Sequence, residues 1–283
     1  MSNQSTIEAW NGPHAERFLR FRPLIEKLNG AHSEQAFALR APTLGERVLD
    51  LGCGLGATTR ELARRVGGEG AVVGFDCSEP MIGVAREEAA REGLSNVRFL
   101  LGDAQRDPMG DDFDLCFSRF GSMFFEAPVE AFQNILRSLR PGGALQLLTW
   151  RPLADNEWLR LGDEIADRHL PPSPEPTIGP FSLSDPDLVR DLLNAAGFEA
   201  IEVEPIDFEL GLEVETMVAL ATRFGPAGRR LRDLSAKEAA LGFDVERELE
   251  AVLRSRSVEG RVTLGSASWH ILARRPSDDS TTR

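Results

Sequence analysis

Residues 45–150 alternate between short apolar runs and segments whose apolar residues recur at helical spacing. A short apolar run bounded by turn residues predicts a buried strand, and apolar residues three or four positions apart predict an amphipathic helix. Strands are predicted at residues 47–51, 71–75, 97–101, 113–118 and 144–150. Helices are predicted at 57–66, from Ser78 to Ala89 and at 126–139, with a turn at 141–143. This alternation predicts a parallel, doubly wound α/β sheet, which binds ligands at the carboxyl ends of its strands.

The rest of the chain is less regular. Its predicted elements are a helix at 185–196, strands at 199–207 and 262–274, and helices within 6–40 and 213–257. The Pro-rich segment 171–180 predicts a surface loop, because Pro breaks helices and central strands. The polar segment 276–283 predicts a disordered tail.

Composition excludes several classes of protein. The 283 residues are 42% apolar, enough for a sizeable core without a disulfide or a metal. The net charge of −13 opposes sequence-independent binding to nucleic acid or anionic lipid. No apolar run approaches the ~18 residues of a membrane-spanning helix, and the first ten residues lack a secretory signal pattern. Three cysteines make no disulfide framework, no metal-ligand spacing occurs, and the lack of Tyr excludes phenol chemistry. We therefore expect a cytoplasmic protein that binds small molecules.

The strongest motif is a glycine loop, V-L-D-L-G-C-G-L-G at residues 48–56, between a predicted strand and a predicted helix. Glycine lets the backbone turn sharply and lets a ligand approach the main chain. Asp76 stands twenty residues after Gly56, at the end of the second predicted strand. A carboxylate at that place can accept both hydrogen bonds of a ribose diol. The sequence therefore predicts a nucleoside site.

Two alternatives remain open from these residues. The loop also fits the relaxed dinucleotide pattern G-x-G-x-x-G/A, which would make the protein a nicotinamide-dependent oxidoreductase. Against this, Asp50 would face an incoming pyrophosphate but suits an ammonium group, Asp103 could accept an adenine amino group, and no Lys stands near the loop. A non-catalytic nucleoside-binding module is the second alternative.

Four motifs in order carry a resemblance to a known family: V-L-D-L-G-C-G-L-G, G-F-D-C-S, L-G-D-A and L-R-P-G-G. They resemble the class I S-adenosylmethionine-dependent methyltransferases over residues 45–150. Further segments resemble the bacterial branch that includes the ubiquinone/menaquinone C-methyltransferases and many small-molecule enzymes: W-N-G-P, S-R-F-G-S-M-F-F, W-R-P-L-A-D-N-E-W and W-H-I-L-A-R-R-P. The resemblance implies a seven-stranded, mostly parallel Rossmann-like sheet whose last strand is antiparallel and inserted beside the fifth.

The resemblance also implies a role for each motif in binding S-adenosylmethionine. The first motif would hold the methionine part, through Asp50 and the loop of Gly52, Cys53, Gly54 and Gly56. Asp76 would bind the ribose, Cys77 and Met81 would flank adenine, and Asp103 with Ala104 would bind its edge. Ser118 and Arg119 would close over the sulfonium end.

Residues outside the core are expected to form a helical cap and to bind a small methyl acceptor. The expected parts are a cap at 1–44, a cofactor-binding core at 45–150, a loop, helix and sixth strand at 151–208, a cap insertion at 209–260, the last strand at 261–275 and the tail at 276–283. Candidate acceptor-binding residues are Trp10, Phe120, Asn156 and Trp158, and His14 is the candidate general base. Methyl transfer needs alignment more than a base, because a sulfonium methyl is already activated. A homodimer is possible.

Overall fold

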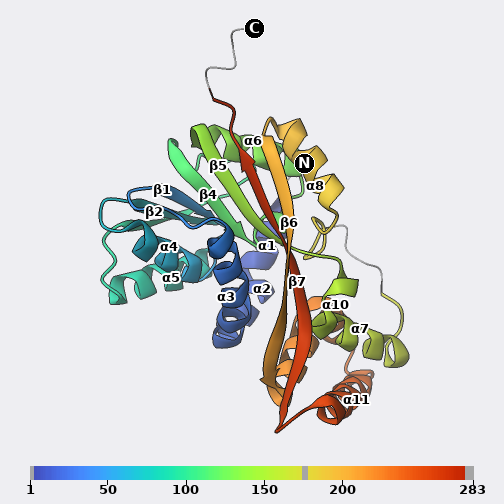
Figure 1. Ribbon diagram of the computed structural model, residues 1–283. Helices are drawn as coiled ribbons and strands as arrows, with labels where there is room; N and C mark the ends of the chain where they lie inside the picture. Colours follow the sequence, from blue (N-terminus) through green and yellow to red (C-terminus); the bar gives the residue numbers. More distant parts are fainter. Residues whose placement is uncertain (1–2, 174–177, 278–283) are drawn as a thin grey trace. The chain divides into compact units, whose positions relative to one another are not determined.

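The computed structural model describes residues 3–173 and 178–277 (Figure 1). Its seven-stranded sheet has the order β3-β2-β1-β4-β5-β7-β6. The strands are β1 Arg47–Leu51, β2 Ala71–Asp76, β3 Val97–Leu101, β4 Phe113–Arg119, β5 Leu139–Trp150, β6 Glu199–Glu213 and β7 Arg261–Arg274. β1 to β5 pair in parallel, and β7 is antiparallel and lies between β5 and β6. The predicted α/β fold is confirmed.

Helices connect the parallel strands as the apolar pattern predicts. In the core they are α4 Ala57–Val66, α5 Glu79–Arg91, α6 Pro128–Ser138 and α8 Pro186–Ala196. Each buries an apolar face, and in α4 this face includes Leu62, Ala63 and Val66. α8 begins where the Asp185 carboxylate accepts the N–H of Asp187, and it ends at Gly197 in the left-handed region. The predicted helices are confirmed with small changes at their ends.

Two strands are longer than predicted. β5 begins at Leu139, so the predicted turn at 141–143 is part of the strand. The reason is a partner distant in sequence, because Gly142 N–H donates to the Arg275 carbonyl and Arg275 N–H donates to that of Gly143. The register with β4 shifts here, which is a bulge. β6 continues to Glu213 rather than ending at 207.

Contacts between Cα atoms divide the chain into two compact units. We call them the sheet unit, residues 1–149, 182–206 and 269–283, and the helical unit, residues 150–181 and 207–268. The sheet unit also contains the N-terminal helices α1 Gln4–Asn11, α2 Pro13–Arg20 and α3 Arg22–Leu39, and the 3-10 turn η1 Ser122–Phe124. The helical unit contains η2 Leu153–Asp155, α7 Glu157–His169, α9 Val214–Arg223, α10 Gly225–Arg232 and α11 Ala239–Arg256.

The N-terminal helices are joined to the sheet unit by specific contacts. The Ser78 hydroxyl donates to the Trp10 carbonyl at 2.6 Å. The Asn11 amide donates to the Cys77 carbonyl at 2.8 Å and accepts the N–H of Glu79 at 2.9 Å. α3 buries Ile25, Leu28 and Phe37 among other residues. These contacts place the N-terminal segment at the carboxyl end of β2, where the nucleoside site is predicted.

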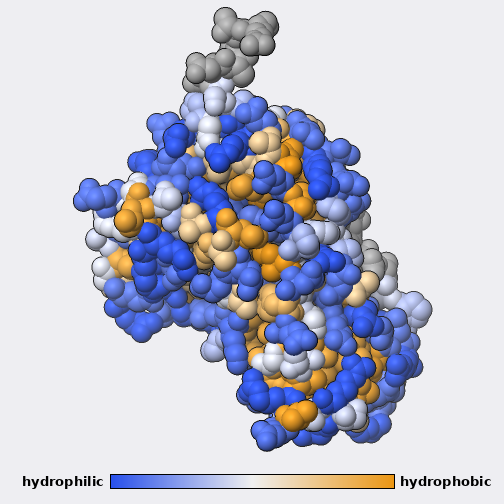
Figure 2. Space-filling model, viewed as in Figure 1, coloured by the Kyte–Doolittle hydropathy of each residue, from blue (hydrophilic) through white to orange (hydrophobic). Residues whose placement is uncertain are grey.

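The helical unit has a core of its own. α7 packs against α9, α10 and α11. The buried guanidinium of Arg230 donates to the carbonyls of Ala166, Leu170 and Pro171, which closes the C-terminal end of α7. Among the described helices, none is both long and apolar enough to cross a membrane. Figure 2 shows charged and polar residues over much of the visible surface, with apolar side chains between them.

Candidate cofactor site

The glycine loop after β1 is held in a conformation that only small residues allow. Gly52 and Gly54 have φ of +67° and +52°. A Cβ at Gly52 would lie 2.8 Å from the Cα of Gly121, and one at Gly54 would lie 2.9 Å from the Cε of Met81. The N–H groups of Gly52 and Cys53 donate to the Phe75 carbonyl of β2. The loop therefore lies close to the end of β2 and to the corner after β4.

Asp76 connects this loop to the end of β2. One carboxylate oxygen accepts the N–H of Gly54 at 2.8 Å, and the other accepts the N–H of Ser78 at 2.9 Å. A carboxylate has about four acceptor positions, and the N–H groups of Gly54, Ser78 and Cys77 do not fill all of them. Burial raises the pKa of Asp76, and the backbone N–H groups oppose this shift. A pair of hydroxyl donors would further stabilise the ionised form.

Asp50, inside the motif, is 1% exposed. It accepts a hydrogen bond from the Thr59 hydroxyl of α4 at 2.6 Å. Burial raises the pKa of Asp50 from 3.8 to about 7, against the opposing effects of the Thr59 bond and the charge of Arg119. A cation bound nearby would favour the ionised carboxylate. This environment suits an ammonium group better than a phosphate.

The residues expected around adenine lie at the ends of β2 and β3. The Asp103 carboxylate accepts the N–H of Gln105 and the side-chain amide of Asn3, each at 3.0 Å. The Ala104 carbonyl accepts the Asn134 amide at 2.9 Å. Met81 is buried with Leu55 of the glycine loop, and Trp10 and Phe18 pack on this cluster. An apolar wall therefore lies beside the glycine loop, and Asp103 follows the end of β3 at the carboxyl edge of the sheet.

The carboxyl end of β4 supplies Ser118 and Arg119, and Phe120 follows directly after the strand. Ser118 is fully buried, and among the described residues its hydroxyl has no hydrogen-bond partner. Arg119 donates to the Ser33 hydroxyl of α3 at 2.9 Å. Phe120 has φ of +62°, which is strained for a residue with a Cβ, and its ring lies 5.2 Å from that of His32. Strained residues cluster at functional sites, so this corner is a candidate site element.

Trp10 and His14 belong to an aromatic cluster of the sheet unit. The Trp10 ring lies 5.1 Å from the rings of His14 and Phe18, and 5.2 Å from that of Phe124 after β4. The cluster therefore joins the N-terminal helices to the β4 corner. An acceptor-binding role for Trp10 and a role as base for His14 stay predictions.

Asn156 and Trp158 belong to the helical unit. The buried Asn156 amide group donates to the carbonyls of Arg151 and Ala267 and accepts the N–H of Ala267. Trp158 is 2% exposed and packs against Trp150 with ring centres 5.9 Å apart. These contacts hold the start of α7 against β7. The predicted acceptor contacts of both residues stay predictions.

Four further residues, not predicted from the sequence, contact the candidate site residues: Asn3, Asn11, Ser33 and Thr59. Thr59 lies only nine positions after Asp50, in the first turn of α4, so its contact with β1 is local in sequence. Asn11 had a local signal, in the W-N-G-P segment. Asn3 and Ser33 touch residues about 100 and 86 positions away, so no local pattern marks them.

The cysteines of the site are not suited to nucleophilic catalysis. Burial raises the pKa of Cys77 to about 12 and that of Cys53 well above its usual value. Both thiols are therefore neutral at pH 7. Among residues 3–173 and 178–277, no three His, Cys, Asp or Glu side chains are grouped so that they could hold a metal ion.

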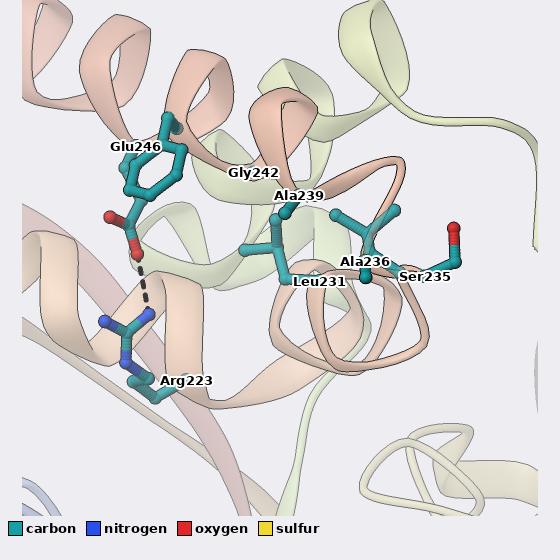
Figure 3. A pocket seen from close by; sticks show the side chains of 9 residues that line it. Arg223, Leu231, Ser235, Ala236, Ala239, Gly242 and Glu246 are labelled. Carbon is teal, nitrogen blue, oxygen red and sulfur yellow. Dashed lines mark hydrogen bonds and ion pairs between the residues drawn. The ribbon is translucent and has the colours of Figure 1, made fainter.

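A separate hollow of about 300 Å³ lies within the helical unit (Figure 3). Leu231, Leu234 and Phe243 line it, together with an ion pair of 2.7 Å between Arg223 and Glu246. None of the predicted site residues lines this hollow.

Comparison with known proteins shows that the chain is similar to methyltransferases in sequence and in fold. The family model for a methyltransferase domain matches residues 48–143. Nocamycin O-methyltransferase of Saccharothrix syringae is 33% identical over 213 residues, which cover 71% of this chain and 72% of that protein. The ubiquinone/menaquinone C-methyltransferase UbiE of Pseudomonas aeruginosa is 38% identical over 129 residues, 45% of this chain and 50% of UbiE. The YcgJ protein of Bacillus subtilis shares the fold, with a TM-score of 0.57, 18% identity, and coverage of 86% of this chain and 99% of YcgJ.

The chain belongs to the class I S-adenosylmethionine-dependent methyltransferases. Its residues fit that cofactor: the glycine loop carries no side chain at Gly52 and Gly54, the Asp76 carboxylate contacts this loop through the N–H of Gly54, and among the described residues the buried Ser118 hydroxyl has no hydrogen-bond partner. The resemblance read from the motifs is confirmed. The oxidoreductase and the non-catalytic module find no support.

Proposed function

We propose that the enzyme binds S-adenosylmethionine along the carboxyl edge of β3, β2 and β1 and methylates a small organic acceptor held beyond β4. The observation that carries the proposal is Asp76, whose carboxylate organises the glycine loop and keeps acceptor positions for a ribose diol. Asp103 then lies on the adenine side and Asp50 on the methionine side, because the strand order is β3-β2-β1.

When bound, the cofactor supplies a methyl group activated by a sulfonium and takes up the electron pair of the broken carbon–sulfur bond. The protein's part is positioning. Asp76 and the backbone of Gly54 orient the nucleoside, and Asp50 favours the cationic amino group. The apolar cluster of Trp10, Met81 and Leu55 excludes water from the same edge.

An oxygen nucleophile is the acceptor atom that we favour. The proposal rests on nocamycin O-methyltransferase, the relative whose similarity extends over 71% of this chain. An acidic hydroxyl loses its proton to water or to a weak base. His14 is the residue proposed to accept it, through its place in the aromatic cluster beside the site. The N-terminal helices within 6–40, which belong to the sheet unit, are proposed to form a cap over the acceptor.

Calorimetry tests the cofactor and the class of reaction together. S-adenosylhomocysteine and NAD⁺ are titrated into the wild-type protein and into Asp76→Ala. We expect one S-adenosylhomocysteine per chain, no heat with NAD⁺, and weakened binding in the variant. A screen of phenols, carboxylic acids and enols, read by release of S-adenosylhomocysteine, then identifies the acceptor. Binding of NAD⁺ alone would reject the proposal.

The proposal also covers the location and the oligomeric state of the enzyme. We infer a cytoplasmic enzyme from the composition, and a homodimer is proposed as its assembly. Light scattering coupled to size exclusion measures the mass in solution. A single-chain mass near 31.1 kDa would reject the dimer.

A further inference from the structure

Arg119 ends β4 at the carboxyl edge of the sheet and is half buried. One of its N–H groups donates to the Ser33 hydroxyl at 2.9 Å. A guanidinium has five N–H donors, so this contact leaves most of them available. Within the described part of the chain, no ion pair of 4 Å or less reaches Arg119, although the buried Arg60 and Arg230 each have one. Burying a cation without an anion beside it costs free energy. An anionic ligand that pairs with the cation would offset this cost.

The two acids whose charges act on Arg119, Asp50 and Glu26, have other partners. Glu26 pairs with Arg22 at 2.8 Å, and Asp50 accepts the Thr59 hydroxyl at 2.6 Å. The charges of both carboxylates raise the pKa of Arg119, but burial has the larger effect. The pKa of Arg119 is therefore lowered from its ordinary value. Arg119 therefore keeps a charge that the protein itself leaves without a close counterion.

The position of Arg119 points to the reacting end of the site. The proposed cofactor passes from Asp103 on β3, past Asp76 on β2, to Asp50 on β1. β4 is the next strand, and Phe117 pairs with Asp50, so Arg119 lies two residues further toward the carboxyl edge on the same face. This place is beyond the methionine part, on the side of the methyl group.

We propose that Arg119 binds an anionic oxygen of the methyl acceptor and so selects acceptors that carry a carboxylate or a comparable acidic group. This inference rests on the proposed function. A guanidinium beside a sulfonium is electrostatically unfavourable when nothing lies between them. An anionic acceptor placed there pairs with Arg119 and with the sulfonium at once, and a planar carboxylate matches the guanidinium fork.

The bound anion serves as a handle that orients the acceptor. The nucleophilic atom next to it then faces the methyl group, and the anion itself needs no base because it is ionised at pH 7. The methionine part of the cofactor also carries a carboxylate that could pair with Arg119. The experiments therefore have to distinguish the acceptor carboxylate from the cofactor carboxylate.

The acceptor side is tested by binding to the enzyme saturated with S-adenosylhomocysteine. The probes are 2-naphthoate and its neutral analogue 2-naphthamide, titrated into wild type, Arg119→Gln, Arg119→Lys and the control Arg190→Gln. Arg190 is an exposed arginine of α8 that pairs with Asp187 at 2.8 Å. We expect Arg119→Gln to weaken naphthoate binding by roughly 10- to 100-fold, the effect of one charged hydrogen-bonding partner, and Arg119→Lys to recover part of it. Naphthamide affinity and the control stay unchanged.

The cofactor side is tested with S-adenosylhomocysteine and with 5′-methylthioadenosine, which lacks the amino-acid part. If Arg119→Gln weakens only S-adenosylhomocysteine, the partner of Arg119 is the methionine carboxylate and the inference is wrong. Equal naphthoate binding by wild type and Arg119→Gln, or none to either, also overturns it. A wild-type protein that does not bind S-adenosylhomocysteine refutes the proposed function itself. Thermal unfolding of each variant checks that it is folded.

Discussion

Replacing Asp76 by Ala removes a side chain that links the glycine loop, the end of β2 and the proposed ribose site. The carboxylate accepts two backbone N–H groups, from Gly54 and Ser78, at 2.8 and 2.9 Å. Two charge-assisted bonds to the ribose diol would be lost as well. We expect Asp76→Ala to cost roughly 2–4 kcal/mol of cofactor affinity, about 30- to 1,000-fold in Kd.

Stability should change less than affinity in this variant. Two effects oppose one another in the unliganded protein, because the substitution removes two hydrogen bonds and also the burial of a carboxylate whose pKa is raised. Calorimetry with S-adenosylhomocysteine measures the affinity, and thermal unfolding measures the stability. Asp187→Ala, an exposed acid of α8, is the control and should bind like wild type. A folded Asp76→Ala protein with wild-type affinity would refute the assignment of the ribose site.

Three further predictions concern the loop, its buried acid and the N-terminal helices. Burial raises the pKa of Asp50 from 3.8 to about 7, so the folded state retains a proton that the unfolded state loses. The wild-type free energy of unfolding should therefore fall relative to that of Asp50→Asn as the pH rises from about 4 to about 7, and parallel urea curves across that range would contradict this. Gly54→Val should lose cofactor binding and some stability, because its Cβ would meet Met81 at 2.9 Å and its φ is +52°. Gly83→Ala, at a helical glycine with nothing within 4 Å of the new Cβ, is its control. In hydrogen exchange, α1 and α2 should gain protection when S-adenosylhomocysteine binds while α8 does not, and equal protection with and without ligand would count against the N-terminal cap.

The parts of the fold with local causes could be predicted from the sequence. β1, the glycine loop and α4 follow one another within twenty residues, and each leaves a pattern in the chain: an apolar run, the glycines and a helical face. The end of β2 marks Asp76 in the same way. The order of the last two strands came from the family resemblance, since apolar runs alone do not give strand order.

The remaining features depend on contacts between distant parts of the chain. The start of β5 could not be predicted, because its glycine-rich residues are held by Arg275 at the far end of the sequence. Ser33 meets Arg119 for a similar reason, as the helix and the strand that carry them join only in the folded protein. The contact of the Asn156 amide with Ala267, 111 positions away, likewise left no local pattern, and the acceptor role of Asn156 stays a prediction.

A crystal structure of the protein with S-adenosylhomocysteine tests the central claim most directly. We expect both ribose hydroxyls within hydrogen-bond distance of the Asp76 carboxylate, the adenine amino group near Asp103, and the homocysteine part beside the glycine loop. A ligand bound elsewhere, or one whose ribose makes no contact with Asp76, would contradict it.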